Sequence, residues 1–464
     1  MLNPNVGLGW LLVPREYGVY GVSIALLTIL SFFVVSGFPI AASKLISEET
    51  CKDELRIFKT SLTGNILLGL FVSIIFWFIS GFLPLEDYRF LIFIVILMTI
   101  LASVKSVYQS TLQGFFRFKE MGALSILEVF LKLIFGVGLV YLGFGAFGAV
   151  TGLFIAGLVS LFVLFFLFRD FKFWRVRGWE KRVLFFTFPV FLGMLGFTLI
   201  QNLDILVLKF VSYGDPDRLA GLYQASLLIA RVPFFLTGTF MMAVFPFISR
   251  DNNNIYSRVS LKYVMLFIFP VSIAITLKPN AFLYLVYPVS YAEAAPVLRV
   301  LALGMGFFTI ITVLSNIFQA SGKPEIPARL LLITSGLQLS LLLILVPVIG
   351  IVGAALATLL ACLIGTIGLA YYYWKIYGIE IKISALTSLL MFSFLVRLLP
   401  FHNRLEIIAS SVIAFGVYML LLAAFKLLRV EDINILMEAL PTHPFTLSVA
   451  RNIKSMVYYL NNIF

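Results

Sequence analysis

The chain has 464 residues, of which 61% are hydrophobic and only 12% are charged, and its formal net charge is +12. A soluble domain carries about 25% charged residues, so this chain could not cover its apolar surface in water, and the composition predicts an integral membrane protein. The basic residues lie in short segments between apolar runs instead of forming a stripe on a polar domain, so we expect no nucleic-acid partner.

The residues that usually carry metal or redox chemistry are scarce. Cys51 and Cys362 are the two cysteines, and His402 and His443 are the two histidines. They form no disulfide framework, and no CxxC, HExxH or Walker A sequence is present. We therefore expect no metal, no cofactor and no catalytic residues.

A membrane-spanning helix needs about 20 mostly apolar residues. Runs of this length predict an all-α polytopic protein with about 13 spans, because charged residues, proline and glycine separate that many runs. The expected spans are residues 17–41, 60–83, 88–113, 121–142, 146–168, 183–208, 219–247, 260–285, 296–320, 326–347, 350–374, 383–400 and 406–428. The run 383–400 is the weakest of them, since it is short and ends in charged and proline residues.

Most lysines and arginines fall on one side of these spans, and the side richer in them is cytoplasmic in membrane proteins. The segment 169–182 and the tail after residue 428 are therefore expected inside, and the loop 209–218 is expected outside. We predict a multi-pass protein of the cell (cytoplasmic) membrane.

An internal repeat of about 205 residues organises the chain. The stretch that begins at Gly18 resembles the one at Gly221, LQGFFRFKE around Gln113 resembles FQASGKPE around Gln319, and GAFGA at 145–149 resembles GIVGA at 350–354. Paired spans would run in the same direction, so we expect two parallel lobes with a substrate cavity between the repeats.

The repeat divides the chain into an N-terminal lobe, 1–168, a linker, 169–182, and a C-terminal lobe, 183–374. Two additional spans, 375–428, and an amphipathic tail, 429–464, follow. Shifting the span 183–208 back by the repeat length places its partner almost wholly before Met1. We therefore expect the first helix of the first lobe to be missing.

Five charged residues lie within the predicted spans: Arg231, Lys105, Glu128, Lys132 and Asp204. Each costs at least about 2.5 kcal/mol to insert, so these are the candidates for substrate binding. Glu128 and Lys132 are spaced so that they can pair on one helix face. Arg231 suits a phosphate, although contacts to backbone carbonyls would also explain it.

The remaining candidates have structural explanations as well: an internal salt bridge for the pair, interfacial solvation for Asp204, and snorkelling for Lys105. Two prolines, Pro189 and Pro233, are hinge candidates, though proline is also common in membrane helices without such a role.

Three segments carry a family resemblance. They are VPREYGVYGVSIALLTILSFFVVSGFPIAASKLISEE, FPVFLGMLGFTLIQNLDILVLKFVSYGDPDRLAGLYQASLLIARVP and FQASGKPE. In this order they resemble polysaccharide flippases of the O-antigen (Wzx-like) branch within the multidrug/oligosaccharidyl-lipid/polysaccharide (MOP) superfamily. The resemblance covers about Val13 to Leu428.

The resemblance implies movement of a polyprenyl-pyrophosphate-linked oligosaccharide from the cytoplasmic to the outer leaflet by alternating access. It implies that Arg231 lines the lobes and that the last two spans support the lipid tail. The expected partners are this substrate, membrane lipids, a coupling ion (Na⁺ or H⁺), and a glycan polymerase or glycosyltransferases.

Two alternatives stay open from the sequence. A cation-coupled drug or solute antiporter of the same superfamily would be expected to have an acidic interior, whereas the five charges sum to a positive value. A membrane-embedded glycan-processing enzyme would need catalytic acids or a metal-binding pair on a substantial outer loop, and the predicted outer loops are short.

Overall fold

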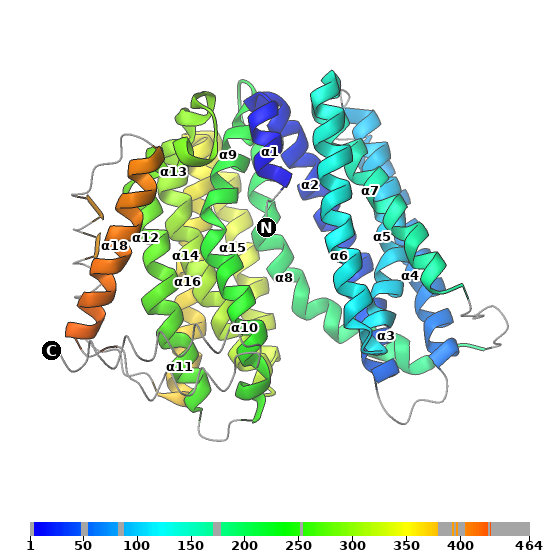
Figure 1. Ribbon diagram of the computed structural model, residues 1–464. Coiled ribbons are helices and arrows are strands. Elements are labelled where there is room, and N and C mark those ends of the chain that lie inside the picture. Colours follow the sequence, from blue (N-terminus) through cyan, green and yellow to red (C-terminus); the bar gives the residue numbers. More distant parts are fainter. Residues whose placement is uncertain are drawn as a thin grey trace. The chain divides into compact units, whose positions relative to one another are not determined.

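The apolar runs form helices that pack into two compact units in the computed structural model (Figure 1). The structure describes residues 4–47, 54–81, 88–169, 178–250, 254–378, 392–393, 396–397, 404–425 and 427, and every regular element within them is a helix. Unit 1 is Met1–Gln224 and unit 2 is Ala225–Phe464, so the division falls inside one helix. The domain boundaries predicted from the repeat stay a prediction.

Among the described residues, unit 1 contains eight α-helices and the start of a ninth, which continues into unit 2. Its helices are α1 (Pro4–Leu11), α2 (Pro14–Val35), α3 (Phe38–Ser47), α4 (Glu54–Ser80), α5 (Arg89–Gly114), α6 (Phe118–Leu131), α7 (Gly145–Leu167), α8 (Lys181–Val211) and the start of α9 (Pro216–Ala230). Two π-helical turns, Lys132–Val137 and Val140–Phe144, continue α6 toward α7.

Unit 2 continues with α10 (Val232–Arg250), α11 (Ile255–Tyr263), α12 (Phe269–Leu277), α13 (Pro279–Val286), α14 (Ala295–Ala320), α15 (Glu325–Ile349), α16 (Ile351–Tyr377) and α18 (Arg404–Ala424). A π-helical turn, Val264–Ile268, joins α11 to α12, and a 3-10 helix, Val289–Ala294, leads into α14.

The helices agree with the predicted polytopic membrane protein. Within the described ranges, nine helical segments are long and apolar enough to cross a membrane, and the bent pair Pro216–Ala230 and Val232–Phe245 would make ten. One segment, Phe118–Leu167, has 50 residues. At 1.5 Å per residue it would be about 75 Å long if straight, more than twice the hydrocarbon thickness, so it accommodates the two spans predicted there.

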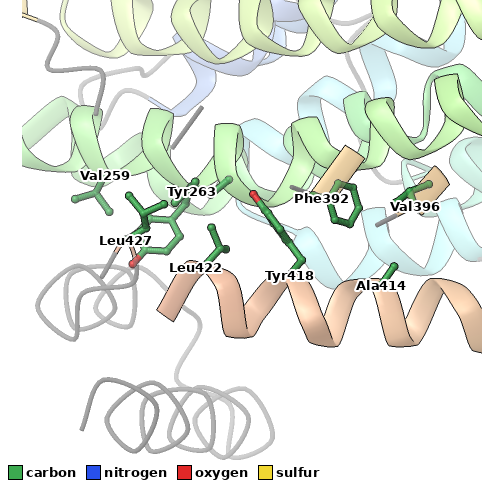
Figure 2. Packing of buried hydrophobic residues seen from close by; sticks show 9 residues of the cluster. Val259, Tyr263, Phe392, Val396, Ala414, Tyr418, Leu422 and Leu427 are labelled. Atoms are coloured by element: carbon green, nitrogen blue, oxygen red, sulfur yellow. The ribbon is translucent and has the colours of Figure 1, made fainter. Parts of the chain in front are cut away.

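The end of the chain is described only in part. Helix α18 coincides with the predicted span 406–428, whereas the predicted span 383–400 and the tail 429–464 lie almost wholly outside the described residues. In Figure 2, Tyr418 and Leu422 of α18 pack with Val259 and Tyr263 of α11 in one buried apolar cluster. This contact anchors α18 to the rest of unit 2.

The two repeats share unusual backbone conformations. Gly145 has φ 52° and ψ −143°, and Gly350, its counterpart, has φ 63° and ψ −137°. Phe116 and its counterpart Gly322 both have positive φ, 57° and 73°. Only glycine adopts such conformations freely, so their recurrence at matching positions supports the internal repeat.

The same helix ending recurs after α5 and α14. The Arg117 N–H donates to the Leu112 carbonyl at 2.9 Å, and the Lys323 N–H donates to the Phe318 carbonyl at 2.9 Å. Each is the long hydrogen bond of a Schellman motif, which closes a helix with one left-handed residue. The turn that reverses the chain is therefore repeated, and it sets the packing of α5 on α6.

Helices α2 and α9 cross with their backbones in direct contact. A Cβ atom on Gly18 would lie 1.7 Å from the Asp217 carbonyl oxygen, and one on Gly221 would lie 1.7 Å from the Pro14 carbonyl oxygen. These two glycines are the pair that the repeat aligns, and each meets the residue four positions before the other. The crossing is therefore reciprocal.

Candidate functional site

Three of the five predicted charges meet in unit 1. Lys105 of α5 and Lys132, which follows α6, both pair with Glu128 of α6. The Lys132 Nζ lies 2.8 Å from Glu128 Oε1, while Lys105 uses the other carboxylate oxygen, Oε2. The pairing of Glu128 with Lys132 predicted from their spacing is confirmed in geometry, and Lys105 joins the same carboxylate.

The α5–α6 turn brings these residues to one depth. Lys105 lies about 14 Å before the end of α5, and Glu128 lies about 15 Å after the start of α6, at 1.5 Å per residue. Because α5 and α6 are joined by a tight turn and pack against each other, equal distances from that turn place the side chains opposite one another. Lys132 follows Glu128 by one helical turn on the same face.

We call Lys105, Glu128 and Lys132 the ion triad. Its side chains are 13%, 18% and 35% exposed, respectively, so it is largely removed from solvent. One carboxylate neutralises only one of the two ammonium groups, and the triad keeps a net positive charge. Lys132 is its most exposed member.

The second repeat has no charges at the corresponding positions. Ile311, Thr334 and Gln338 replace Lys105, Glu128 and Lys132. The Gln338 Nε2 donates to the Thr358 Oγ1 at 3.0 Å, and both side chains are buried. Since the same arrangement of helices packs with neutral residues in unit 2, the fold does not require the ion triad.

A π-helical turn begins at Lys132 itself. Such a turn inserts one residue into an α-helix and shifts the side chains that follow it, and in other proteins it is frequent at functional sites. Two glycines with positive φ, Gly143 and Gly145, end this stretch before α7 begins. The irregular backbone thus starts at the most accessible residue of the ion triad.

Asp204 lies apart from the ion triad, on α8. It is 1% exposed, and it accepts hydrogen bonds from the Tyr223 hydroxyl at 2.7 Å and the Ile205 N–H at 2.8 Å. Interfacial solvation, one explanation considered from the sequence, does not fit this burial. The nearby Lys209 instead pairs with Asp217. The hydrogen bond from Tyr223 indicates that Asp204 holds α8 against α9.

Arg231 lies in unit 2, between α9 and α10. The two helices are bent by 40° at this residue. Pro233 explains the bend, because a proline lacks the N–H that would bond the Ile229 carbonyl and its ring clashes with that carbonyl. The side chain of Arg231 is half-buried. Whether it binds substrate, and whether Pro233 acts as a hinge, stay predictions.

The other hinge candidate, Pro189, lies within α8. The helix runs from Lys181 to Val211 without an interruption in its helical assignment. Its role as a hinge is likewise a prediction. Among the described residues, no group of three or more His, Cys, Asp or Glu side chains could hold a metal ion.

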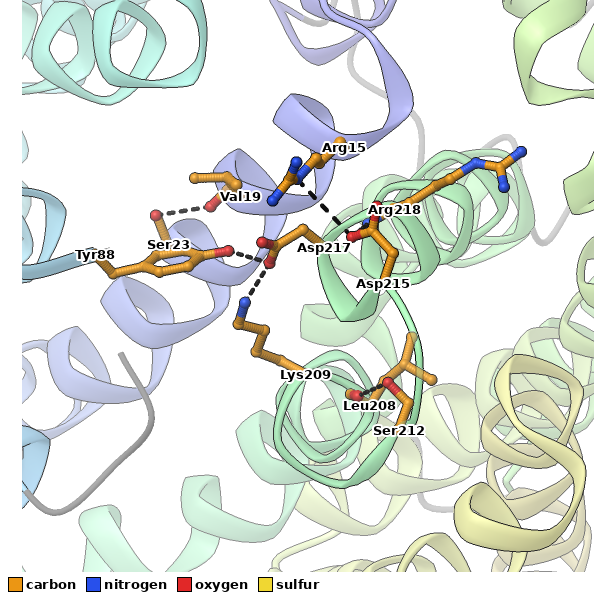
Figure 3. A network of polar contacts seen from close by, with 10 residues as sticks. All are labelled: Arg15, Val19, Ser23, Tyr88, Leu208, Lys209, Ser212, Asp215, Asp217 and Arg218. Carbon is orange, nitrogen blue, oxygen red and sulfur yellow. Dashed lines mark hydrogen bonds and ion pairs between the residues drawn. The ribbon is translucent and has the colours of Figure 1, made fainter. Parts of the chain in front are cut away.

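A second polar network, not predicted from the sequence, lies around the start of α9 (Figure 3). The Asp217 carboxylate accepts hydrogen bonds from the Tyr88 hydroxyl and from the Lys209 Nζ. The Lys209 Nζ also lies 4.3 Å from the centre of the Tyr88 ring. Burial and the hydrogen bond to Asp217 raise the pKa of Tyr88, so its hydroxyl stays protonated and donates.

This network, which we call the outer cluster, surrounds the α2–α9 crossing. Asp217 is the residue whose carbonyl faces Gly18. Arg15 of α2 approaches Asp215, just before α9, with 3.9 Å between Nε and Oδ1. No spacing pattern links Tyr88, Lys209 and Asp217 along the sequence, so only the folded arrangement identifies the cluster.

Comparison with known proteins agrees with this architecture. A family model described as "Polysaccharide biosynthesis protein" matches residues 5–252. The uncharacterized membrane protein MJ1375 of Methanocaldococcus jannaschii is 26% identical over 370 residues, which are 76% of this chain and 88% of that protein. MJ1068 of the same organism, also an uncharacterized membrane protein, is 24% identical over 180 residues, which are 37% of this chain and only 35% of that protein.

Two solved structures share the fold. Lipid II flippase MurJ, in an inward closed conformation, has a TM-score of 0.74 at 16% identity and covers 91% of this chain and 95% of its own. An inward-facing multidrug resistance MATE family transporter of the MOP superfamily has a TM-score of 0.63 at 15% identity, over 80% of this chain and 94% of its own. The chain therefore has the fold of MOP superfamily transporters.

Proposed function

Because the chain belongs to the polysaccharide biosynthesis protein family, we propose that it translocates a polyprenyl-pyrophosphate-linked oligosaccharide. In this proposal the substrate moves from the cytoplasmic to the outer leaflet of the cell membrane by alternating access, for polysaccharide biosynthesis. The Wzx-like branch, suggested by the sequence motifs, is the finer assignment that we favour. The observation that carries the proposal is the ion triad, a net positive group in the membrane-spanning part of unit 1.

A pyrophosphate cannot cross about 30 Å of hydrocarbon without a replacement for its hydration. A protein that moves it must offer cations or hydrogen-bond donors that the folded protein already holds in place, inside the membrane, before the substrate binds. The ion triad meets this requirement, because Glu128 pairs with both lysines and leaves one formal positive charge in excess.

In the mechanism that we propose, a phosphate oxygen of the substrate displaces Glu128 as the partner of Lys132. Glu128 then remains paired with Lys105, so the exchange strands no buried charge. A hydrogen bond to a charged group contributes about 1.5–3 kcal/mol, enough to hold the head group but weak enough to release it. Release reverses the exchange and restores the Lys132–Glu128 pair.

Replacing Lys132 with glutamine tests this role. Loss of a contact of this size should lower translocation of a fluorescent lipid-linked oligosaccharide in proteoliposomes by about tenfold or more. The melting temperature should remain near that of the wild type, because Glu128 keeps Lys105. Glu120→Gln, at the surface ion pair with Arg117 on the same helix, is the matched control and should leave translocation unchanged. Normal translocation by a stably folded Lys132→Gln protein would eliminate the proposed exchange.

Arg231 is a second candidate for phosphate recognition, on unit 2. Arg231→Lys keeps the charge but loses the planar fork of donors, so translocation should fall in part, and Arg231→Ala should lower it further. If Arg231 only stabilises the bend, the alanine variant should instead lose thermal stability in proportion to activity. Flipping normalised to folded protein, measured beside a melting curve, separates the two roles.

Net transport needs a source of free energy, because a conformational equilibrium alone only redistributes substrate. We propose that a Na⁺ or H⁺ gradient, or consumption of the product by a glycan polymerase, supplies it. Glycosyltransferases that build the oligosaccharide would then supply the substrate on the cytoplasmic side.

A further inference from the structure

A second group of cations lies in unit 2, at the end that the sequence predicts to be cytoplasmic. There the start of α11, the end of α14 and the end of α16 meet. The Arg258 Nη2 donates to the Tyr377 carbonyl at 2.9 Å. The Lys323 Nζ lies 5.9 Å from the centre of the Tyr377 ring, which in turn lies 6.1 Å from the Phe318 ring. We call this group the Arg258 corner.

Two hydroxyls in this corner are buried. Tyr373 and Tyr377 are 1% and 7% exposed, their ring centres lie 5.0 Å apart, and neither hydroxyl has a hydrogen-bond partner among the residues that the structure describes. A buried donor left unpaired costs about 1–3 kcal/mol, so two of them together point to a ligand that they bind.

The first repeat does without these hydroxyls. With the offset of 205 that pairs Gly145 with Gly350, Tyr373 corresponds to Phe168 and Tyr377 corresponds to Lys172. The matching end of unit 1 is closed by aromatic packing, with the Phe168 ring stacked 5.9 Å from the Phe58 ring. A phenylalanine can therefore fill the position of Tyr373 in this packing, and packing alone does not explain the Tyr373 hydroxyl.

The charges of the corner are also unneutralised. Within the part of the chain that the structure describes, neither Arg258 nor Lys323 forms an ion pair with a carboxylate. Arg258 is exposed and Lys323 is half-buried, so both cations are nearer the surface than the two hydroxyls. The Tyr377 carbonyl uses one of the five N–H donors of Arg258, which leaves donors for an anion.

We propose that the Arg258 corner binds a phosphate group. Arg258 and Lys323 would supply the charge, and the Tyr373 and Tyr377 hydroxyls would donate to phosphate oxygens. The phosphate can come from the head group of an anionic lipid or from solution, and both sources offer the same chemistry to these donors. The Arg258 corner lies in unit 2, whereas the ion triad lies in unit 1, and the proposal does not depend on the transported substrate.

Thermal melting of the full chain in a maltoside detergent, which contains no phosphate, tests the proposal. Phosphatidylglycerol is added in one arm and inorganic phosphate in the other, with sodium chloride at equal ionic strength as the reference. One or both should raise the melting temperature of the wild type by about 3 °C, because a ligand that binds only the folded state stabilises it. A response to the lipid alone assigns the phosphate to a head group, and a response to the inorganic ion assigns it to solution.

The double variant Tyr373→Phe, Tyr377→Phe removes both hydroxyls and keeps the rings. It should melt at or above the wild-type temperature without phosphate, and it should lose more than half of the phosphate-induced shift. Arg258→Gln should lose the shift as well, and it provides a second reading if the double variant folds poorly. Tyr371→Phe, an exposed tyrosine on the same helix, is the control and should keep the full shift. A wild-type protein that responds to neither probe, or a double variant that keeps the whole shift, would overturn the proposal.

Discussion

Phe116 occupies a left-handed backbone position that suits glycine better than phenylalanine. It adopts φ 57° in the turn after α5, where its counterpart in the second repeat is Gly322. A left-handed conformation costs a residue with a Cβ about 1–2 kcal/mol, and the Phe116 ring is exposed, so it recovers little by packing.

We therefore expect Phe116→Gly to raise the melting temperature of the protein in detergent. Phe116→Ala, which removes the ring but keeps the Cβ strain, is the matched control and should not raise it. Gly322→Ala should lower the melting temperature, because it introduces the strain at the corresponding turn. Equal melting of the Gly and Ala variants at position 116 would mean that backbone strain is not what limits this turn.

Asp217 gives a second prediction at the scale of single residues. Asp217→Asn would leave Lys209, which is 9% exposed, without its carboxylate partner. Breaking a buried pair in this way costs about 3 kcal/mol, so the melting temperature should fall clearly. Asp215→Asn removes the partner of Arg15 in an exposed pair two residues away, and it should cost less than about 1 kcal/mol. Similar losses from both variants would argue against the outer cluster as a stabilising contact.

The residues that the sequence could identify are those whose partners are near in the chain. Glu128 and Lys132 pair because they are one helical turn apart, which a pattern of four residues predicts. Lys105 joins them through the folding of α5 onto α6, and Tyr88 meets Asp217 across a sequence distance of more than a hundred residues. Such contacts depend on tertiary packing, and no local spacing encodes them.

At the scale of helices, hydrophobic length predicted where the spans lie but not how they bend. The span predicted at 219–247 is two helices with a 40° bend at Arg231, and the one at 260–285 contains a π-helical turn before α12. Apolar composition is nearly constant through these segments, so hydropathy does not report the breaks. The local sequence indicates these breaks through Pro233 and Pro270, which lie at the starts of α10 and α12.

The contact between α2 and α9 should be sensitive to a side chain at either glycine of the crossing. Gly18→Ala or Gly221→Ala would place a Cβ against a backbone carbonyl, and the two helices would have to move apart by more than an ångström. Overpacking of this kind costs about 1–3 kcal/mol, so each variant should melt at a lower temperature.

Gly238→Ala is the control for these variants. Gly238 lies inside α10 and a Cβ there meets nothing within 4 Å. Alanine is the better helix former, so this variant should melt at or slightly above the wild-type temperature. If all three alanine variants melt like the wild type, the backbone contact is looser than the crossing geometry indicates.

For the whole molecule, the sequence motifs and the fold lead to the same superfamily by separate routes. The motifs lie mainly in the turns and crossings, where glycine, proline and tyrosine are needed for geometry. The fold is similar to those of MurJ and a MATE transporter at only 15–16% identity. Similar folds carry different cargoes on different side chains, so our proposal for the substrate rests on the charged residues inside this fold.

Proteoliposomes can distinguish a flippase for an anionic lipid-linked oligosaccharide from a cation antiporter. The wild-type protein is placed in proteoliposomes, and two substrates are compared: a fluorescent polyprenyl-pyrophosphate oligosaccharide and a lipophilic organic cation. We expect protein-dependent translocation of the lipid-linked oligosaccharide, and no uptake of the cation above that of empty liposomes. Uptake of the cation without translocation of the oligosaccharide would contradict the proposed flippase function.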